Sequence, residues 1–320
     1  MIAGFDIGGT KCAVILADSQ DGKVTFLERR EFPTIGTPES VIERLLDTLY
    51  AELKSHGLTK NELTAAGISC GGPLNGKRGL ILSPPNLPGW DRVPITKIIK
   101  SRLHIPVKLC NDADACALAE WKYGAGKGTQ NMVFLTFGTG LGAGLILNGK
   151  LYTGANNFAG EVGHIRLNDQ GPCGYGKIGS FEGFCSGAGI AKLAKNYAEE
   201  KFQMGKTVEF CSAIEKMNDI TAKSLYLAAK SGSRQAQEVF ALSGKYLGRG
   251  LAIIADILNP EKIVIGGVYM RAQEFIEKAM KKSLRNEALC IPAKVKILPA
   301  GLGEKIGDYA TIVAAEALDD

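Results

Sequence analysis

The first 18 residues, MIAGFDIGGTKCAVILAD, place an aspartate and two glycines between two apolar runs. Glycine supplies the positive φ that tight turns need and aspartate tolerates turn geometry, so the segment predicts a β-hairpin with its turn at residues 6–11. Such a turn does not require a carboxylate, two glycines, a hydroxyl and an ammonium together. Backbone N–H groups exposed by glycines form concave anion sites. The turn is therefore also a candidate phosphate-binding loop, although one glycine-rich turn is weak evidence by itself.

The composition is that of a globular protein with many turns. The chain has 320 residues, of which 45% are hydrophobic and 22% charged, and its 40 glycines follow no G-X-Y period. A formal net charge of +5 without a clustered basic face argues against nucleic-acid binding. The chain begins on a strand-like run, and glycines interrupt its longest apolar stretch at 132–147. We therefore expect no signal peptide, no membrane span and a cytoplasmic location.

Cysteine usage agrees with a reducing compartment. The irregular spacing of the cysteines, several of them inside apolar runs, predicts mostly buried free thiols. They are Cys12, Cys70, Cys110, Cys116, Cys173, Cys185, Cys211 and Cys290.

The order of expected elements indicates an internal duplication. Residues 1–28 and 130–152 both read as apolar strand, Gly-rich turn, apolar strand, turn and strand. Strands alternating with helices around such a duplication predict two α/β lobes with a cleft between them. We expect strands at 2–6, 12–17, 23–28, 63–70, 107–111, 262–268 and 295–301, and helices at 39–57, 113–126, 189–203, 221–232, 233–258, 272–289 and 308–318.

Five motifs in register resemble the ROK family of sugar kinases, within the actin and hexokinase superfamily. They are FDIGGTK at 5–11, NDADACALAE at 111–120, FGTGLGAG at 137–144, EVGH at 161–164 and LNPEKIVIGGV at 258–268. A strict P-loop is absent, because YGAGKGT at 123–129 has Gly128 where Ser or Thr must bind magnesium. The resemblance runs from residue 2 to about residue 316.

The resemblance implies a two-lobed α/β fold of the actin/hexokinase-like (ribonuclease H-like) type. Each lobe would be a five-stranded mixed sheet flanked by helices, with MgATP and a sugar in the cleft. We expect residues 1–115 plus 303–320 to form the N-terminal lobe and residues 116–302 the C-terminal lobe.

ATP and Mg²⁺ are the cofactors that the resemblance implies. Asp6 would organise the Mg²⁺ through water, since Mg²⁺ prefers oxygen ligands and retains its waters. The first phosphate-binding turn of the family is matched by Asp6, Gly8, Gly9, Thr10 and Lys11, and the second by Gly138, Thr139, Gly140 and Gly142. Gly266 and Gly267 resemble the glycine pair close to the adenosine.

Asp112 resembles the catalytic base of the family. Phosphoryl transfer needs in-line positioning, neutralisation of the γ-phosphate and a carboxylate that accepts the hydroxyl proton. The alternative for Asp112 is a helix N-cap, a common role for Asp at this kind of position. Asp114 fits a first-turn partner of the helix dipole.

Further residues resemble the sugar-binding set of the family. Carboxylates and an imidazole that bind adjacent ring hydroxyls discriminate strongly, because a missing hydroxyl leaves buried polar groups unpaired. The alternative for His164 is a structural histidine with satisfied hydrogen bonds. The set comprises Glu161, His164 and Glu182, with further contacts at Gly71, Gly72, Asn86, Asn111 and Asp112.

The sequence departs from the family at a zinc knuckle. Many members carry C-x-C-G-x-x-G-C-x-E after the EVGH histidine, whereas this chain reads CGYGKIGSFE. Cys173 and Glu182 keep their places, but Tyr175 and Ser180 occupy the other two cysteine positions. Structural zinc takes four tetrahedral ligands, and His164 with Cys173 supplies only two. We predict no zinc and a loop held by packing and hydrogen bonds.

The combined prediction is an ATP-dependent kinase that transfers the γ-phosphoryl group to a hydroxyl of a hexose or N-acetylhexosamine. Its partner would be a small-molecule sugar, with no nucleic acid and no membrane, in a homodimer as is common in the family. One alternative is a sugar-sensing ROK-type transcriptional regulator without its DNA-binding module. A first strand at residue 2 leaves no room for such a module. A non-catalytic sugar-binding protein is the other alternative.

Overall fold

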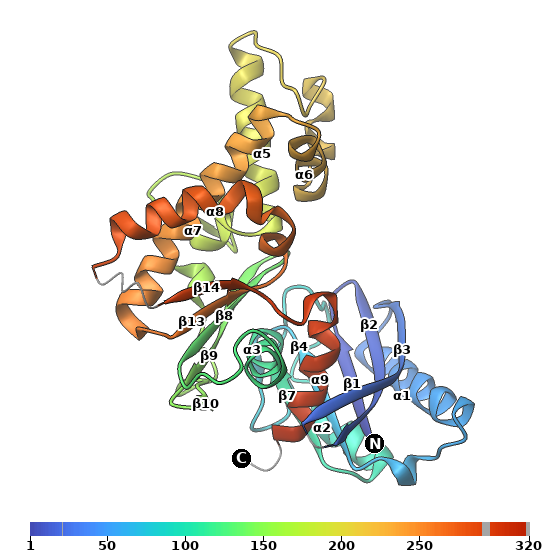
Figure 1. The fold of residues 1–320 in the computed structure, drawn as a ribbon. Helices are drawn as coiled ribbons and strands as arrows, with labels where there is room; N and C mark the ends of the chain where they lie inside the picture. Colours follow the sequence, from blue (N-terminus) through green and yellow to red (C-terminus); the bar gives the residue numbers. More distant parts are fainter. Residues whose placement is uncertain (21, 290–294, 318–320) are drawn as a thin grey trace. The chain divides into compact units, whose positions relative to one another are not determined.

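The computed structural model describes residues 1–20, 22–289 and 295–317 and contains two five-stranded sheets with helices packed on them (Figure 1). The chain divides into two compact units. The first unit comprises Met1–Gly128, Gly144–Ala159 and Gly301–Asp320, and the second comprises Thr129–Ala143 and Gly160–Ala300.

The first sheet has the strand order β3-β2-β1-β4-β7. β1 pairs antiparallel with β2 and parallel with β4, and β7 lies parallel to β4, so the sheet is mixed. Its elements are β1 (Ile2–Ile7), β2 (Lys11–Gln20), β3 (Lys23–Pro33), β4 (Ala65–Cys70) and β7 (Val107–Asn111), with α1 (Pro38–Ser55), α2 (Ile95–Leu103), α3 (Asp112–Tyr123) and α9 (Ile306–Glu316). The short elements within these residue ranges are η1 (Lys60–Glu62), β5 (Leu74–Asn75), β6 (Leu80–Ile81), η4 (Gly303–Lys305) and β10 (Lys150–Leu151), the last of which is an edge strand of the second sheet.

Alternation along β2 builds two apolar layers around this sheet. Val14 and Leu16 join the larger core that contains the α1 side chains, whereas Ile15 packs with Ile312 of α9 on the other face. Glycine allows α9 to approach closely, because a Cβ on Gly67 of β4 would lie 2.0 Å from the carbonyl oxygen of Thr311. The middle and the C-terminal half of α9 are thereby held against the sheet.

The second sheet has the order β10-β9-β8-β13-β14, which repeats the order of the first and agrees with the predicted duplication. β13 is parallel to β8 and β14, and β10 is antiparallel to β9. The elements are β8 (Met132–Phe137), β9 (Leu141–Leu147), β13 (Lys262–Ile265) and β14 (Lys296–Pro299), with η2 (Val162–His164), β11 (Cys173–Gly174), β12 (Lys177–Ile178), α4 (Phe181–Phe184), α5 (Gly187–Gln203), η3 (Ile214–Asp219), α6 (Ala222–Lys230), α7 (Arg234–Leu258) and α8 (Val268–Glu287). The predicted α/β fold with two five-stranded mixed sheets is confirmed.

Four elements differ from the prediction. Helix α2 was not expected, because a single-turn repeat of Ile95, Ile99 and Leu103 after a proline is a weak periodic signal. The strand predicted at 262–268 ends at Ile265, and α8 begins at Val268, four residues before the predicted helix start at 272. Gly267 has φ +64°, which ends the extended backbone there. Strand β3 continues to Pro33, beyond the predicted end at residue 28.

The described cysteines carry free thiols. Four of them, Cys12, Cys70, Cys185 and Cys211, are buried, and the other three described ones are half-buried. Cys290 and the predicted helix end at residue 318 lie outside the described residues. Among the helices that the structure describes, none is long and apolar enough to cross a membrane.

Candidate active site

The carboxyl ends of three parallel strands gather one group of predicted site residues in the first unit. Asp6 lies near the end of β1, Gly71 follows β4, and Asn111 ends β7. The register pairs Asp6 with Ser69 and Cys70 with Asn111, so these positions share one edge of the sheet. Ligand sites of open α/β sheets form at this edge, where strands end and loops begin.

The glycine-rich turn that follows β1 is fixed by its own backbone and by Thr34. The amide of Gly8 donates to the carbonyl oxygen of Lys11 at 3.1 Å, and the Thr34 hydroxyl donates to the carbonyl oxygen of Gly8 at 2.7 Å. A Cβ on Gly9 would lie 2.3 Å from the carbonyl oxygen of Asn86, so only glycine permits this contact. Gly9, Thr10 and Lys11 are exposed, and the turn therefore presents its surface to a ligand.

Asp6 lies beneath this turn in an electrostatically unfavourable place for a carboxylate. Burial, together with the nearby carboxylates of Asp112 and Asp308, raises the pKa of Asp6 to about 6, although Arg29 and Lys11 oppose the rise. A Cβ on Gly307, at the start of α9, would lie 3.5 Å from Oδ2 of Asp6. A cation near Asp6 would relieve this repulsion, so these oxygens fit Mg²⁺ with part of its water shell.

Asn111, rather than Asp112, caps α3. Its Oδ1 accepts hydrogen bonds from the amides of Ala113 at 2.9 Å and Asp114 at 3.4 Å. The alternative role of Asp112 as the N-cap is therefore wrong, because Asp112 is the first residue of the helix proper. Asp114 lies in the first turn, as predicted for a partner of the helix dipole.

The Asp112 carboxylate is accessible to a ligand, and its pKa is raised by its surroundings. Its Oδ1 accepts the amide of Ala113 at 2.8 Å, and its Oδ2 lies 3.8 Å from where a Cβ on Gly71 would stand. The residue keeps an exposed surface, yet the surrounding protein displaces enough water to raise the pKa of Asp112, against the lowering effect of the Ala113 amide. Such a carboxylate can accept a proton from a ligand hydroxyl.

In the second unit, a second glycine-rich turn lies beside the starts of two helices. The amide of Gly138 donates to the carbonyl oxygen of Gly140 at 3.1 Å, and the amide of Gly187, at the start of α5, donates to the carbonyl oxygen of Gly138 at 2.7 Å. Gly267 precedes α8, and a Cβ there would lie 2.0 Å from the carbonyl oxygen of Phe137. Helix N-termini carry partial positive charge and unpaired N–H groups, which suit anions.

The Glu161–His164 segment and Glu182 lie at the same turn. A Cβ on Gly163 would lie 2.0 Å from the carbonyl oxygen of Leu141, and the amide of Leu141 donates to Oε2 of Glu182 at 3.0 Å. Gly140 must also lack a side chain, because its Cβ would lie 2.7 Å from that same Oε2. One oxygen of Glu182 thus supports the turn. His164 and Glu161 are exposed.

Hydrogen bonds hold the loop that corresponds to the zinc knuckle. Lys177 Nζ donates to the carbonyl oxygen of His164 at 2.8 Å, and Lys192 Nζ donates to the carbonyl oxygen of Cys173 at 2.6 Å. Buried Ser180 caps α4 by accepting the Gly183 amide at 3.1 Å, and the Tyr175 ring meets the His164 ring edge-on at 6.2 Å. Within the described ranges, no three His, Cys, Asp or Glu side chains are grouped to hold a metal ion.

The predicted site residues therefore form two groups. Within the first unit, the structure brings together the first glycine-rich turn, Asp6, Asn86 and the Asn111–Asp112 pair. Within the second, it brings together the second turn, Gly266 with Gly267, and the Glu161, His164 and Glu182 set. The sequence reasoning missed Asp308 in α9 and Arg29 and Glu31 in β3. Their only sequence signal was charge on an expected helix and beside an expected strand.

The fold defines a class of α/β proteins with two duplicated five-stranded sheets, and the comparisons with known proteins identify the family. A family model described as "ROK family" matches residues 2–314, so the chain belongs to the ROK family. N-acetylmannosamine kinase of Escherichia coli (strain 55989 / EAEC) is 34% identical over 275 residues, which cover 85% of this chain and 84% of that protein. The xylose repressor of Caldicellulosiruptor bescii is 32% identical over 270 residues, covering 83% of this chain and 65% of that protein.

A solved structure shows the same fold. The crystal structure of a ROK family glucokinase from Streptomyces griseus, in complex with glucose and AMPPNP, has a TM-score of 0.77 and 30% sequence identity. The match covers 99% of this chain and 98% of that one.

Proposed function

We propose that the protein is an ATP-dependent sugar kinase, which transfers the γ-phosphoryl group of ATP to a hydroxyl of a hexose or N-acetylhexosamine. Family membership and the kinases among its relatives support this class of activity. The observation that carries the proposal is the placement of Asp6 and Asp112 at one sheet edge beside an exposed glycine-rich turn. A carboxylate that accepts the proton and a turn that binds phosphates are two of the parts that phosphoryl transfer requires.

Asp112 acts as the general base in this proposal. One of its oxygens is engaged by the Ala113 amide, which orients the carboxylate and leaves Oδ2 to accept the proton of the attacking sugar hydroxyl. Its raised pKa brings its basicity closer to neutrality, where a general base is most effective. Asn111 orients the first turn of α3 and presents its amide nitrogen as a donor for a sugar oxygen.

The two glycine-rich turns bind the phosphates, and Gly266 with Gly267 lies close to the adenosine. Their exposed backbone N–H groups and the helix starts beside the second turn stabilise negative charge. Asp6 would hold Mg²⁺ through water, and the bound ion would neutralise phosphate charge. Lys11 adds a positive charge at the first turn.

Sugar recognition falls to Glu161, His164 and Glu182, together with Asn86 and the Gly71–Gly72 pair. Glu182 has one carboxylate oxygen on the Leu141 amide, so its other oxygen remains available for a hydroxyl. This arrangement links the sugar-binding set to the second phosphate turn through Leu141. Assembly as a homodimer remains a prediction.

A panel assay tests the proposal. ADP release is measured with MgATP and glucose, mannose, fructose, allose, N-acetylglucosamine, N-acetylmannosamine or a β-glucoside. We expect sugar-dependent ADP release with at least one of the hexoses or N-acetylhexosamines. Sugar binding without any ADP release would contradict the proposal and favour a non-catalytic sugar-binding protein.

The xylose repressor among the relatives supports a second candidate, a sugar-sensing regulator. A gel-shift experiment at physiological salt, with and without sugar, separates the two. The kinase proposal predicts no DNA shift in either condition.

A further inference from the structure

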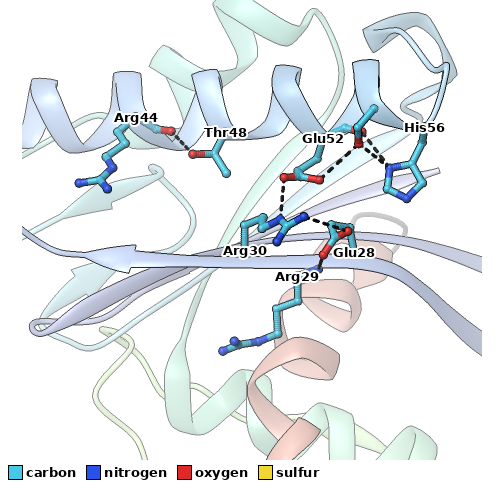
Figure 2. Close-up of polar contacts among 8 residues, drawn as sticks. Glu28, Arg29, Arg30, Arg44, Thr48, Glu52 and His56 are labelled. Atoms are coloured by element: carbon cyan, nitrogen blue, oxygen red, sulfur yellow. Dashed lines mark hydrogen bonds and ion pairs between the residues drawn. The ribbon is translucent and has the colours of Figure 1, made fainter.

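Strand β3 carries ionic side chains on both of its faces, and those on one face pair with α1 whereas those on the other pair with α9. Arg30 donates from Nε to Oε1 of Glu52 in α1 at 2.8 Å, whereas Arg29 donates from Nε to Oδ1 of Asp308 in α9 at 2.7 Å. Figure 2 shows Arg30 directed toward Glu52 and Arg29 directed away from it. Successive side chains of a strand point to opposite faces, which explains the division.

On the α9 face, the ionic contacts continue to the first phosphate turn. The Arg29 guanidinium donates through its second nitrogen, Nη2, to Oε1 of Glu31 at 2.5 Å. The same oxygen accepts a hydrogen bond from Nζ of Lys11 at 2.6 Å. A continuous series therefore runs from Asp308 through Arg29 and Glu31 to Lys11, the last residue of the glycine-rich turn.

Along this series, the exposure of the side chains increases from Asp308 at one end to Lys11 at the other. The side chain of Asp308 is 12% exposed, those of Glu31 and Arg29 are 34% and 39% exposed, and that of Lys11 is 62% exposed. Arg29 and Lys11 lower the pKa of Glu31 to about 2, so Glu31 is a carboxylate at neutral pH. The rigid planar fork of Arg29 fixes Glu31, because it bonds to both carboxylates at once.

An anchored carboxylate limits the freedom of the lysine. A free lysine has about 2 kcal/mol of rotamer entropy to lose when a ligand fixes it. An ammonium has three donors, so one bond to Glu31 leaves two for phosphate oxygens. Holding Lys11 beside the turn before the nucleotide arrives reduces the entropy lost on binding.

We propose that Glu31, held by Arg29 and Asp308, positions the Lys11 ammonium for the terminal phosphates of the nucleotide. The inference rests on the proposed function, in which Lys11 belongs to the phosphate-binding turn. Glu31, Arg29 and Asp308 act through Lys11 and are positioning residues.

The test measures binding of MgADP and MgATP to the full-length protein by calorimetry, without sugar, and then the KM values for MgATP and for the sugar. Glu31→Gln and Arg29→Gln should each weaken nucleotide binding about fivefold and raise the KM for MgATP, with the KM for sugar unchanged within about twofold. In a Lys11→Met background, Glu31→Gln should have no further effect, because the residue through which it acts is gone.

Arg30→Gln is the matched control. Arg30→Gln breaks an ion pair of the same kind, with Glu52, on the face of β3 opposite to Arg29 and Glu31. Because this face does not carry the series that leads to Lys11, nucleotide binding should not change. The proposal is overturned if Glu31→Gln leaves nucleotide affinity unchanged, if its effect persists in the Lys11→Met background, or if Arg30→Gln weakens binding equally.

Failure of the proposed function gives a different result. A wild-type chain that binds MgATP but phosphorylates no sugar contradicts the kinase proposal, while the binding series still tests the role of Glu31. A wild-type chain that binds neither MgADP nor MgATP overturns both.

Discussion

Asp6 lies in an environment that is poorly suited to its charge. Its carboxylate lies partly buried with Asp112 and Asp308 close enough to raise its pKa, and only Arg29 and Lys11 oppose this effect. Ionised carboxylates placed together in this way destabilise the folded chain without a bound cation. The proposed function accounts for this arrangement, because Mg²⁺ bound together with the nucleotide phosphates would interact with these carboxylate oxygens through water.

Removing the Asp6 charge should stabilise the protein at high pH. The pKa of Asp6 is about 6 in the folded chain against 3.8 as the ordinary value, so the folded state binds the proton more tightly and loses stability as pH rises from about 4 to 6. Asp6→Asn should raise the free energy of unfolding by about 3 kcal/mol at pH 8 and have little effect at pH 3. Urea unfolding at both pH values measures this.

Asp47→Asn, on the exposed side of α1, is the control and should change stability little at either pH. An equal stabilisation by Asp6→Asn at pH 3 and pH 8 would show that charge is not the cause.

At the scale of elements, Glu120 fixes the junction between β14 and α9. This fully buried side chain of α3 accepts the amides of Ala125 at 2.7 Å and Gly301 at 3.0 Å through Oε2, and the amide of Leu302 at 2.9 Å through Oε1. The backbone that leads into α9 thereby finds its hydrogen-bond acceptors inside the first unit. Because α9 carries Asp308, this junction also determines the surroundings of Asp6.

Replacing the Glu120 carboxylate with an amide should be costly. In Glu120→Gln, an NH₂ group faces a backbone N–H, and at least one of these three donors loses its acceptor beside the buried side chain. We expect a loss of about 3 kcal/mol in the free energy of unfolding, measured by urea titration. Glu43→Gln breaks an exposed ion pair with Arg102 and should cost less than about 1 kcal/mol. Equal costs for the two variants would contradict the role assigned to Glu120.

The loop at residues 173–182 should retain its structure without zinc. Hydrogen bonds tie this loop to its surroundings: Lys177 donates to the carbonyl oxygen of His164, Lys192 donates to that of Cys173, and Ser180 accepts the amide of Gly183. Elemental analysis of the purified protein should find no stoichiometric zinc, and dialysis against a zinc chelator followed by return to Mg²⁺ should leave ADP release unchanged. One zinc per chain, or activity lost to the chelator and restored by zinc, would contradict this prediction.

At the scale of the whole molecule, repetition in the sequence made the fold predictable. The segments at 1–28 and 130–152, each an apolar strand, a turn and a second apolar strand, form corresponding parts of two sheets that have the same strand order. They could be predicted because strand periodicity and glycine-rich turns are local signals in the sequence. Helix α2 was missed because three apolar residues after Pro94 give little periodicity. The end of β13 at Ile265 was missed because Val268 continues an apolar run, although it begins α8.

The candidate site was predictable only where glycine or a motif marks it. Asp6, Gly9 and Asp112 stand in recognisable strings, and the close approach at Gly9 gives a physical reason for one of them. In the ionic series through Arg29, Glu31 and Asp308, the contact between Arg29 and Asp308 joins residues that lie 279 positions apart in the sequence. No local pattern reveals such a contact, because it depends on α9 returning to the first sheet at the end of the chain.

The central claim is that Asp112 removes a proton from a sugar hydroxyl during phosphoryl transfer. The most direct test is the kcat of Asp112→Asn with saturating MgATP and the best sugar of the panel, alongside calorimetric binding of MgADP. The account predicts a fall in kcat of about 10³-fold with nucleotide affinity unchanged. A variant that keeps a kcat close to that of the wild type would contradict it.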